Sequence, residues 1–365
     1  MRFAAVEREV YIHSPYGGLG AKAPISTVMK PTDLLDTLKR LLPTKQSIFL
    51  MGPPGVGKSD IIRLAATELA AGYYDLRAPL LEAVDLRGLP TVQGGKTTWC
   101  QPDFLPTKDE PIVLAIEELP QAEQSVQKAF FQLVLDRRIG DYILPDQVMV
   151  VAVGNRASDR AGASRTNTAL NNRFCFLHLE VSVEDWQLWA LTSGVAPEVR
   201  AFINFRPSLL HDFDPASNPV EFPSPRSWAA VNRVFRAAPL HLLQEVVAGC
   251  VGQGAAAEFA AFLQLYRQLP DIDVVLRNPA TAHVPTKEPA VMYALIGALT
   301  ERCRQDNTLA GAFATYGTRL PDEYGVLAIR DALAVNRKLA ANPDVQRWTK
   351  QARTKGFFPA AQPEG

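Results

Sequence analysis

The sequence lacks an excess of charge of either sign, a cluster of cysteines and any long apolar run. Lysine plus arginine and aspartate plus glutamate each number 38, so the net charge is zero. This balance argues against nucleic acid as the main partner, because proteins that bind the phosphate backbone normally carry a basic surplus. The four cysteines and five histidines are scattered without a CxxC pair. We therefore expect reduced thiols and no zinc site.

Segments that direct a chain into or across a membrane are also lacking. No apolar stretch approaches the roughly 20 residues that a transmembrane helix needs. The N-terminal segment carries Arg2, Glu7, Arg8 and Glu9, where a signal peptide would have its apolar core. We therefore expect a cytoplasmic protein without a membrane segment. The length of 365 residues suggests about two domains.

What the sequence does contain is a glycine-rich loop, residues 52–59, between an apolar run, residues 47–51, and a helical pattern. This arrangement is that of a phosphate-binding loop, or P-loop. Backbone N–H groups of such a loop point at phosphates, Lys58 would reach the β and γ phosphates, and Ser59 would bind Mg²⁺. The alternative, a turn that binds nothing, is disfavoured because both the consensus and its strand-to-helix context are complete. We predict a nucleoside triphosphate site whose contacts are Gly52, Pro53, Pro54, Gly55, Val56, Gly57, Lys58, Ser59 and Asp60.

Apolar runs after this loop alternate with helical patterns, which predicts an α/β fold with a parallel sheet covered on both faces. A helix is expected at 34–42, before the loop. Two hairpins with two-residue turns interrupt the alternation at 91–99 and 138–144. The expected strands cover residues 73–81, 111–116, 147–153 and 174–181.

Beyond about residue 181 the strand signal fades, and helical patterns alternate with proline-rich breaks. Helices are expected around Trp186 and Trp228, then at 255–269, 290–304, 323–339 and 343–353, with an ordered crossing or linker at 270–289 and a frayed tail at 357–365. This pattern predicts a variable N-terminal arm at 1–29, an α/β nucleotide-binding domain at 30–182, a helical lid at 183–270 and a C-terminal helical extension at 271–365.

Acidic and amide side chains follow two of the buried strands. Glu117 and Glu118 end one strand, and Asn155 follows the next. In a P-loop enzyme the first acid would hold the hydration shell of Mg²⁺ and the second would orient the attacking water, which Asn155 could share. Alternatively, the acids only favour the N-terminus of a helix near Pro120, and Asn155 is a turn residue. The P-loop in the same sheet favours the functional interpretation.

Together these motifs resemble an AAA+ ATPase, and their order and spacing look most like the MoxR group and its dynein-related neighbours. The resemblance covers roughly residues 32–269. Two further segments look like the helix-2 insertion and the pre-sensor hairpin of that group. The residues that carry the resemblance are 52–59, 112–118, Asn155, 169–174 and 224–228, together with 84–90, 99–102 and 138–144.

By this resemblance Asn155 would be sensor 1, Arg173 the arginine finger and Arg226 sensor 2. A finger delivered from a neighbour is worth ~10³ to 10⁵ in rate in related nucleotidases. The alternatives are a surface ion pair for Arg173 and a helix start for Arg226; whether Arg226 acts within its own chain is left open. The resemblance also implies ATP and Mg²⁺ as cofactors, a hexameric ring, a protein client and a partner with a von Willebrand factor A domain.

The chain departs from the family pattern at Glu117, a position that is usually aspartate. The extra methylene would loosen the geometry around Mg²⁺ and slow turnover. One alternative is therefore a nucleotide-gated scaffold with little hydrolysis. Another is a nucleic-acid motor or loader, in which Arg160, Arg165 and Lys96 would face a central pore. A protein-remodelling ATPase is the reading that the sequence favours.

Overall fold

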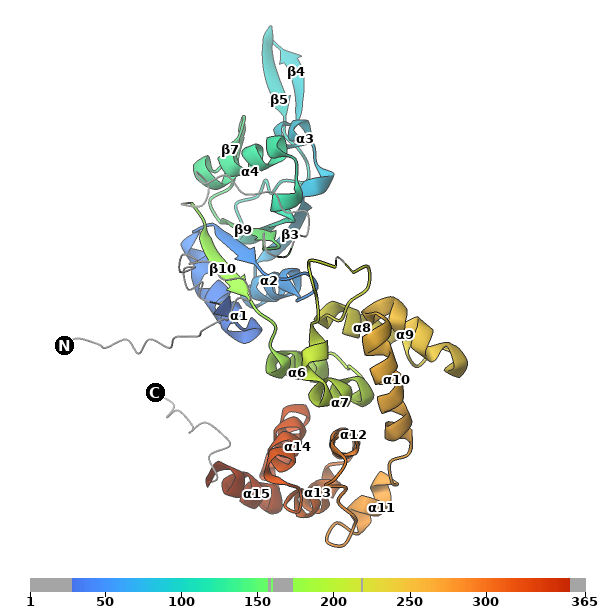
Figure 1. Ribbon diagram of the computed structural model, residues 1–365. Helices are drawn as coiled ribbons and strands as arrows, with labels where there is room; N and C mark the ends of the chain where they lie inside the picture. Colours follow the sequence, from blue (N-terminus) through green and yellow to red (C-terminus); the bar gives the residue numbers. More distant parts are fainter. Residues whose placement is uncertain (1–27, 157–158, 160–172, 218, 355–365) are drawn as a thin grey trace, which may run out of the picture.

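The computed structural model describes residues 28–156, 159, 173–217 and 219–354. Its first part is a six-stranded sheet in the order β1-β10-β2-β9-β6-β3, and all neighbouring strands are parallel (Figure 1). This arrangement confirms the expected α/β fold. The strands are β1 (Val28–Met29), β2 (Ile48–Met51), β3 (Gly72–Arg77), β6 (Ile112–Glu117), β9 (Val148–Gly154) and β10 (Cys175–Leu179).

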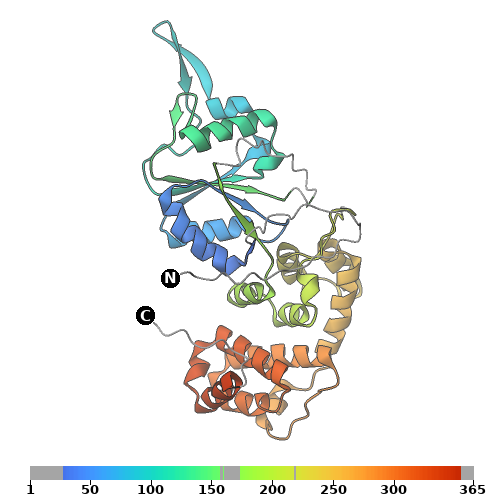
Figure 2. The same cartoon turned by 60° about the vertical axis from the view of Figure 1, so that its left-hand side comes forward.

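Helices cover both faces of this sheet. Helices α1 (Pro31–Leu41) and α2 (Lys58–Glu68) pack on one face, and α3 (Ala83–Arg87) and α4 (Gln124–Asp136) lie on the other (Figure 2). Successive side chains of a strand point to opposite faces, so Val113 and Ala115 of β6 join the core under α2 while Leu114 and Ile116 join the core under α4. The central strands are buried on both sides, which explains their continuous apolar sequences.

Both expected hairpins are present, as β4 (Leu89–Gln93) with β5 (Lys96–Cys100) and β7 (Arg138–Ile139) with β8 (Tyr142–Ile143). The β4–β5 hairpin projects beyond the sheet (Figure 1).

Two strands of the sheet, β3 and β1, differ from expectation. The strand expected at 73–81 ends at Arg77, because Pro79 cannot donate to a ladder and residues 78–80 form a 3₁₀ turn. Val28 and Met29, expected in an irregular arm, pair with His178 and Leu179 at the sheet edge. Residues 1–27 lie outside the described part of the chain.

Among the described residues, five α-helices follow the sheet in the region expected to form the lid, and we refer to them together as the lid. They are α6 (Val183–Thr192), α7 (Pro197–Phe205), α8 (Pro225–Val234), α9 (Leu243–Val251) and α10 (Gln253–Arg267). Phe202, Trp228 and Phe259 meet at its centre with ring centroids 5.2–5.6 Å apart. The buried indole of Trp228 donates to the Leu209 carbonyl at 2.6 Å. Sequence patterns predicted α6, α8 and α10, but not the shorter helices α7 and α9.

The C-terminal helices form a separate core, where Phe313 packs edge-on against Trp348 at 5.5 Å. The segment expected to be an ordered crossing or linker contains a short helix that was not predicted, α11, capped by the Asp271 carboxylate at 2.9 Å from the Asp273 N–H. Helix α13 was also missed. The helices are α11 (Ile272–Arg277), α12 (Pro289–Gln305), α13 (Ala310–Gly317), α14 (Asp322–Val335) and α15 (Pro343–Thr354).

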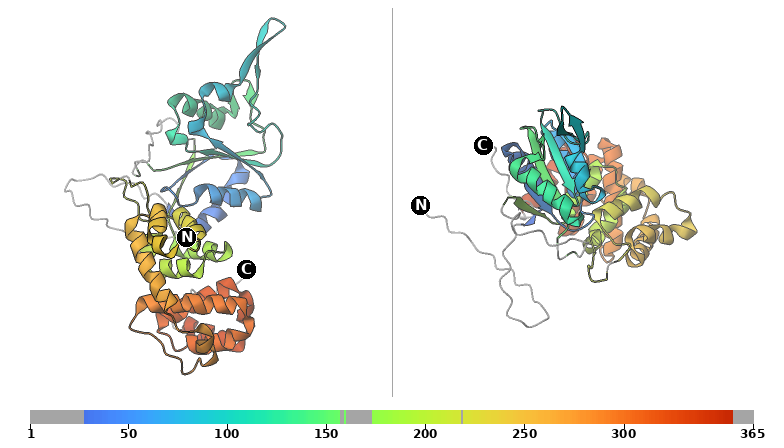
Figure 3. Two further views of the ribbon diagram at one scale, coloured as in Figure 1. Left: turned by 90° about the vertical axis from the view of Figure 1, so that its right-hand side faces the viewer. Right: turned by 90° about the horizontal axis from the view of Figure 1, so that it is seen from above.

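The sheet, the lid and the C-terminal helices follow one another along the long direction of the molecule (Figures 2 and 3). The α12 residue Ala294 belongs to the lid core, so the last two parts are packed together. Among the described residues, no helix is both long enough and apolar enough to span a bilayer. Residues 355–365 lie outside the described part.

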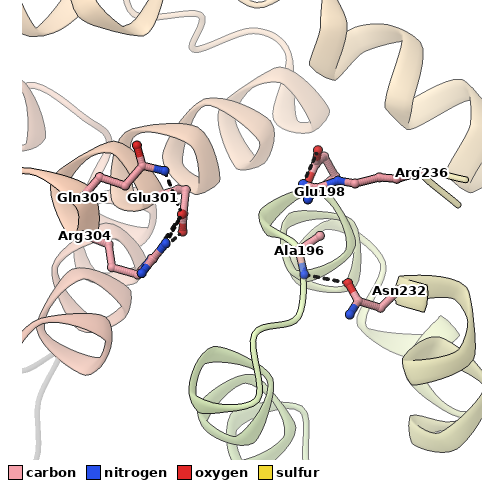
Figure 4. A network of polar contacts seen from close by, with 7 residues as sticks. All are labelled: Ala196, Glu198, Asn232, Arg236, Glu301, Arg304 and Gln305. Atoms are coloured by element: carbon pink, nitrogen blue, oxygen red, sulfur yellow. Dashed lines mark hydrogen bonds and ion pairs between the residues drawn. The ribbon is translucent and has the colours of Figure 1, made fainter. Parts of the chain in front are cut away.

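Polar contacts add detail to this packing (Figure 4). The Asn232 amide oxygen accepts the Ala196 N–H at 2.8 Å and joins α8 to the start of α7. Arg236 pairs with Glu198 at 2.9 Å. On α12, hydrogen bonds from Arg304 hold the pKa of Glu301 below its usual range. Exposed pairs of this kind are worth at most about 1 kcal/mol each, so the apolar cores dominate.

Candidate nucleotide-binding site

The P-loop occupies the turn between β2 and α2, at the carboxyl ends of the parallel strands. Gly57 precedes α2 with a φ of 89°, and no side chain of the described residues caps the helix. The first N–H groups of α2 therefore remain available for an anion. The Lys58 ammonium donates to the Gly52 carbonyl, the Pro53 carbonyl and the Asn155 amide oxygen, each at 2.8 Å. The structure thus brings together the predicted P-loop lysine and the predicted sensor 1.

Charges of both signs surround Lys58. Burial lowers the pKa of Lys58 to about 8, and the carboxylates of Asp159 and Glu117 oppose that shift. The guanidinium groups of Arg226 and Arg156 lower the pKa of Lys58 further. Three cations therefore converge where the first turn of α2 begins. An anion bound there would relieve their mutual repulsion.

Glu117 is suited to a metal because it is buried beside a hydroxyl. Only 8% of the residue is exposed. Burial raises the pKa of Glu117, and a hydrogen bond from the Ser59 hydroxyl opposes that rise. The Oε1 atom of Glu117 has no hydrogen-bond partner among the described residues. Two hard oxygen donors with one unsatisfied oxygen fit Mg²⁺, which binds through one or two protein groups together with phosphate oxygens.

Glu118 has a different environment although it is the next residue. It is exposed, and its φ of 57° turns the chain from β6 into the 3₁₀ segment Leu119–Gln121. This left-handed conformation costs a non-glycine residue of order 1–3 kcal/mol and is often found at functional sites. The strand end thus presents one buried and one exposed carboxylate, which matches separate roles for metal and water.

The lid contacts the P-loop through the start of α8. Ser224 and Ser227 form a capping box there, and the Arg226 N–H donates to the Gly55 carbonyl at 3.1 Å. A Cβ atom on Gly55 would lie 2.7 Å from the Ser224 hydroxyl, at a φ of +76°. Glycine is therefore required at this contact. Arg226 lies beside the P-loop of its own chain.

Three further residues at the site were not predicted from the sequence. The His211 ring nitrogen Nε2 lies 3.1 Å from the Pro54 carbonyl oxygen. Arg156 donates through its backbone N–H to Asp159 at 3.0 Å and through Nη2 to the Leu179 carbonyl at 2.8 Å. The position of Arg156 directly after Asn155 was a usable signal, whereas an isolated histidine carries none.

Arg173 does not join this cluster. The Arg173 carbonyl accepts the Gln46 side-chain N–H at 3.0 Å, at the start of β2 and β10, whose register pairs Ile48 with Cys175. Gln46 and Gly52 are six residue steps apart, which is roughly 20 Å of extended chain. Arg173 therefore lies at the amino ends of the strands, whereas its own P-loop lies at their carboxyl ends. Arg160 and Arg165 lie outside the described residues.

Residues 47–174 match the family model described as an AAA domain of the dynein-related subfamily. This part of the chain is similar to AAA domains. The six-stranded parallel sheet with helices on both faces is the AAA+ P-loop fold. The lid and the C-terminal helices lie outside the matched residues, so the match concerns the nucleotide-binding part. No curated protein matches the sequence.

Solved structures give only distant similarities to this chain. The Thermotoga maritima RuvB Holliday junction branch migration motor is 16% identical, over 92% of this chain and 89% of that chain, with a TM-score of 0.32. Brucella abortus NtrX in complex with ADP is 12% identical, over 89% of this chain and 68% of that chain, with a TM-score of 0.34. TM-scores this low carry no argument about function.

Proposed function

We propose that this chain binds and hydrolyses ATP at the AAA+ P-loop. The observation that carries the proposal is the contact of Lys58 with Asn155, together with the Ser59–Glu117 pair beside it. Lys58 and the P-loop N–H groups bind the phosphates, and Ser59 and Glu117 would hold Mg²⁺, which would neutralise phosphate charge. Glu118 orients and polarises the attacking water, and Asn155 shares that water. Arg226 contributes from the lid of the same chain.

The active assembly in this proposal is a ring. Arg173 lies at the amino ends of the strands, away from its own P-loop at their carboxyl ends. In this proposal its guanidinium therefore serves the nucleotide of a neighbouring copy. There it stabilises the charge that develops on the transferred phosphoryl group. The resemblance to the MoxR group supports six copies.

The work done by the ring is remodelling of a protein client. The lid contacts the P-loop directly through Arg226 and His211, so a change at the phosphates would alter the angle between lid and sheet. The resemblance to the MoxR group supports a partner with a von Willebrand factor A domain. The zero net charge of the chain favours a protein client over nucleic acid.

Separating binding from chemistry tests this function. Lys58→Ala removes the cation that faces the phosphates and should abolish tight ATP binding. Glu118→Gln keeps the size of the side chain but cannot polarise water, so it should bind ATP normally and lose turnover by about 100-fold or more. Equilibrium binding of fluorescent ATP and multiple-turnover phosphate release measure the two effects.

The outcomes distinguish the alternatives. Hydrolysis by Glu118→Gln at the parental rate would show that Glu118 does not position the water. Tight ATP binding without phosphate release by the parental protein would favour the nucleotide-gated scaffold. Stimulation of phosphate release by DNA at low salt would favour the nucleic-acid motor.

A further inference from the structure

Helices α3 and α4 lie below the projecting β4–β5 hairpin (Figure 1). Side chains from α3, β5 and α4 line a groove there. Its cavity volume is about 450 Å³. We call it the α3–α4 groove and define it by the residues that the argument uses. These are Val84 and Arg87 of α3, Trp99 of β5, Lys128 and Ala129 of α4, and Ile139 of β7.

The groove presents apolar side chains to solvent. Val84 is 48% exposed and Trp99 is 37% exposed. The register pairs Pro90 with Trp99 and Val92 with Thr97, so Trp99 and Val92 lie on the same face of the hairpin. Val92 is 79% exposed. An apolar strip thus continues from the groove along one hairpin face, and such surfaces mark sites of protein interaction.

The charged side chains that line the groove are both basic. Arg87 and Lys128 are exposed, and within the described residues neither forms an ion pair. None of the described residues that line the cavity is acidic. Two unpaired cations beside apolar walls are complementary to a segment that carries both carboxylates and apolar side chains.

We propose that the α3–α4 groove and the adjoining hairpin face bind an acidic, apolar-rich peptide segment of a partner protein. The proposal rests on the proposed function, because an ATPase that remodels a client needs a surface that its partner recognises. A peptide fits better than nucleic acid, since nucleic-acid affinity grows with the number of phosphates neutralised. The groove offers two cations, and most of its wall is apolar.

A binding measurement on the full chain without nucleotide tests the groove. The probe is a short fluorescein-labelled peptide in which aspartate and glutamate alternate with leucine and phenylalanine. The comparison probes are the same peptide with lysine at each acidic position and a labelled oligothymidine. Fluorescence anisotropy should show that the acidic peptide binds more tightly than either.

The variants locate the binding surface. The double substitution Arg87→Glu with Lys128→Glu should weaken binding of the acidic peptide by about tenfold or more. The matched control, Lys108→Glu with Lys287→Glu, changes the net charge equally at exposed positions outside the groove and should leave binding within about twofold. Val84→Asp should also weaken binding, because it places a carboxylate on the apolar wall.

Three results would overturn the proposal: an acidic peptide that does not bind, equal weakening in the control variant, and tighter binding of oligothymidine that depends on Arg87 and Lys128. Phosphate release by the groove variants in the absence of peptide should match the parental rate. A failed peptide measurement with normal hydrolysis would therefore reject the groove and leave the ATPase function standing.

Discussion

At the scale of single residues, some groups of the site can be assigned from sequence motifs, and others are brought to the site only by the fold. Lys58 and Asn155 each stand in a recognisable motif, and their contact at 2.8 Å follows from the carboxyl ends of parallel strands meeting at one sheet edge. His211 belongs to a lid loop far along the chain, and its approach to Pro54 depends on how the lid packs. No local pattern encodes that packing.

The unusual acid at the end of β6 gives a prediction at this scale. The Ser59 hydroxyl donates a hydrogen bond to the Glu117 carboxylate, and the length of the glutamate side chain sets where that carboxylate lies. Glu117→Asp shortens the side chain by one methylene, so the carboxylate should withdraw from both Ser59 and the metal. We expect the Mg²⁺ concentration that gives half-maximal phosphate release to rise by about tenfold. Mg²⁺ titrations of both proteins at saturating ATP measure the effect.

Two other results would change the interpretation. Faster turnover in Glu117→Asp at unchanged Mg²⁺ dependence would mean that glutamate is an unfavourable substitution in an otherwise standard site. Superimposable titration curves would mean that Glu117 does not serve the metal and that Glu118 is the functional acid on that strand.

At the scale of elements, the agreement between sequence and structure depends on length and periodicity. Strand β6 and helix α10 were predicted because continuous apolar runs and long amphipathic stripes are strong signals. Helix α7 was missed because it is short and buries Arg200 among its apolar residues. Helix α11 was missed because prolines on either side suggested a linker, although Asp271 caps it. Short elements of this kind are decided by tertiary packing.

The contact between α13 and α15 gives a prediction about stability. A Cβ atom on Gly317 would lie 2.1 Å from the ring of Trp348, and that ring is 5% exposed in a packed core. Gly317→Ala should therefore lower the free energy of unfolding by about 1–3 kcal/mol. The midpoint of urea unfolding measures the change.

A matched glycine in another helix provides the control. A Cβ atom on Gly249 in α9 would have no heavy atom within 4 Å. Gly249→Ala should raise the free energy of unfolding by about 0.5–1 kcal/mol, because alanine favours the helix. A Gly317→Ala protein as stable as Gly249→Ala would show that the ring of Trp348 does not pack closely against α13.

At the scale of the whole molecule, the two halves of the proposed active site lie at opposite ends of the parallel strands. Lys58, Glu117 and Asn155 occupy the edge where β2, β6 and β9 end, and Arg173 lies where β10 begins. The sequence motifs gave both sets of residues, but their separation follows only from the strand register. Under the proposed role of Arg173, this separation means that one copy would need a neighbour to complete its site, and a ring would be the active form.

Complementation between two inactive variants tests the central claim, that ATP is hydrolysed at a site shared by neighbouring copies. Lys58→Ala cannot bind phosphates but keeps Arg173, and Arg173→Ala binds ATP but lacks the finger. Each should be inactive alone. When mixed, interfaces form in which the Arg173 of a Lys58→Ala copy faces an intact P-loop, so phosphate release should reappear in proportion to those interfaces. A co-assembled mixture that stays inactive at every ratio, while the parental protein hydrolyses ATP, would contradict the shared site.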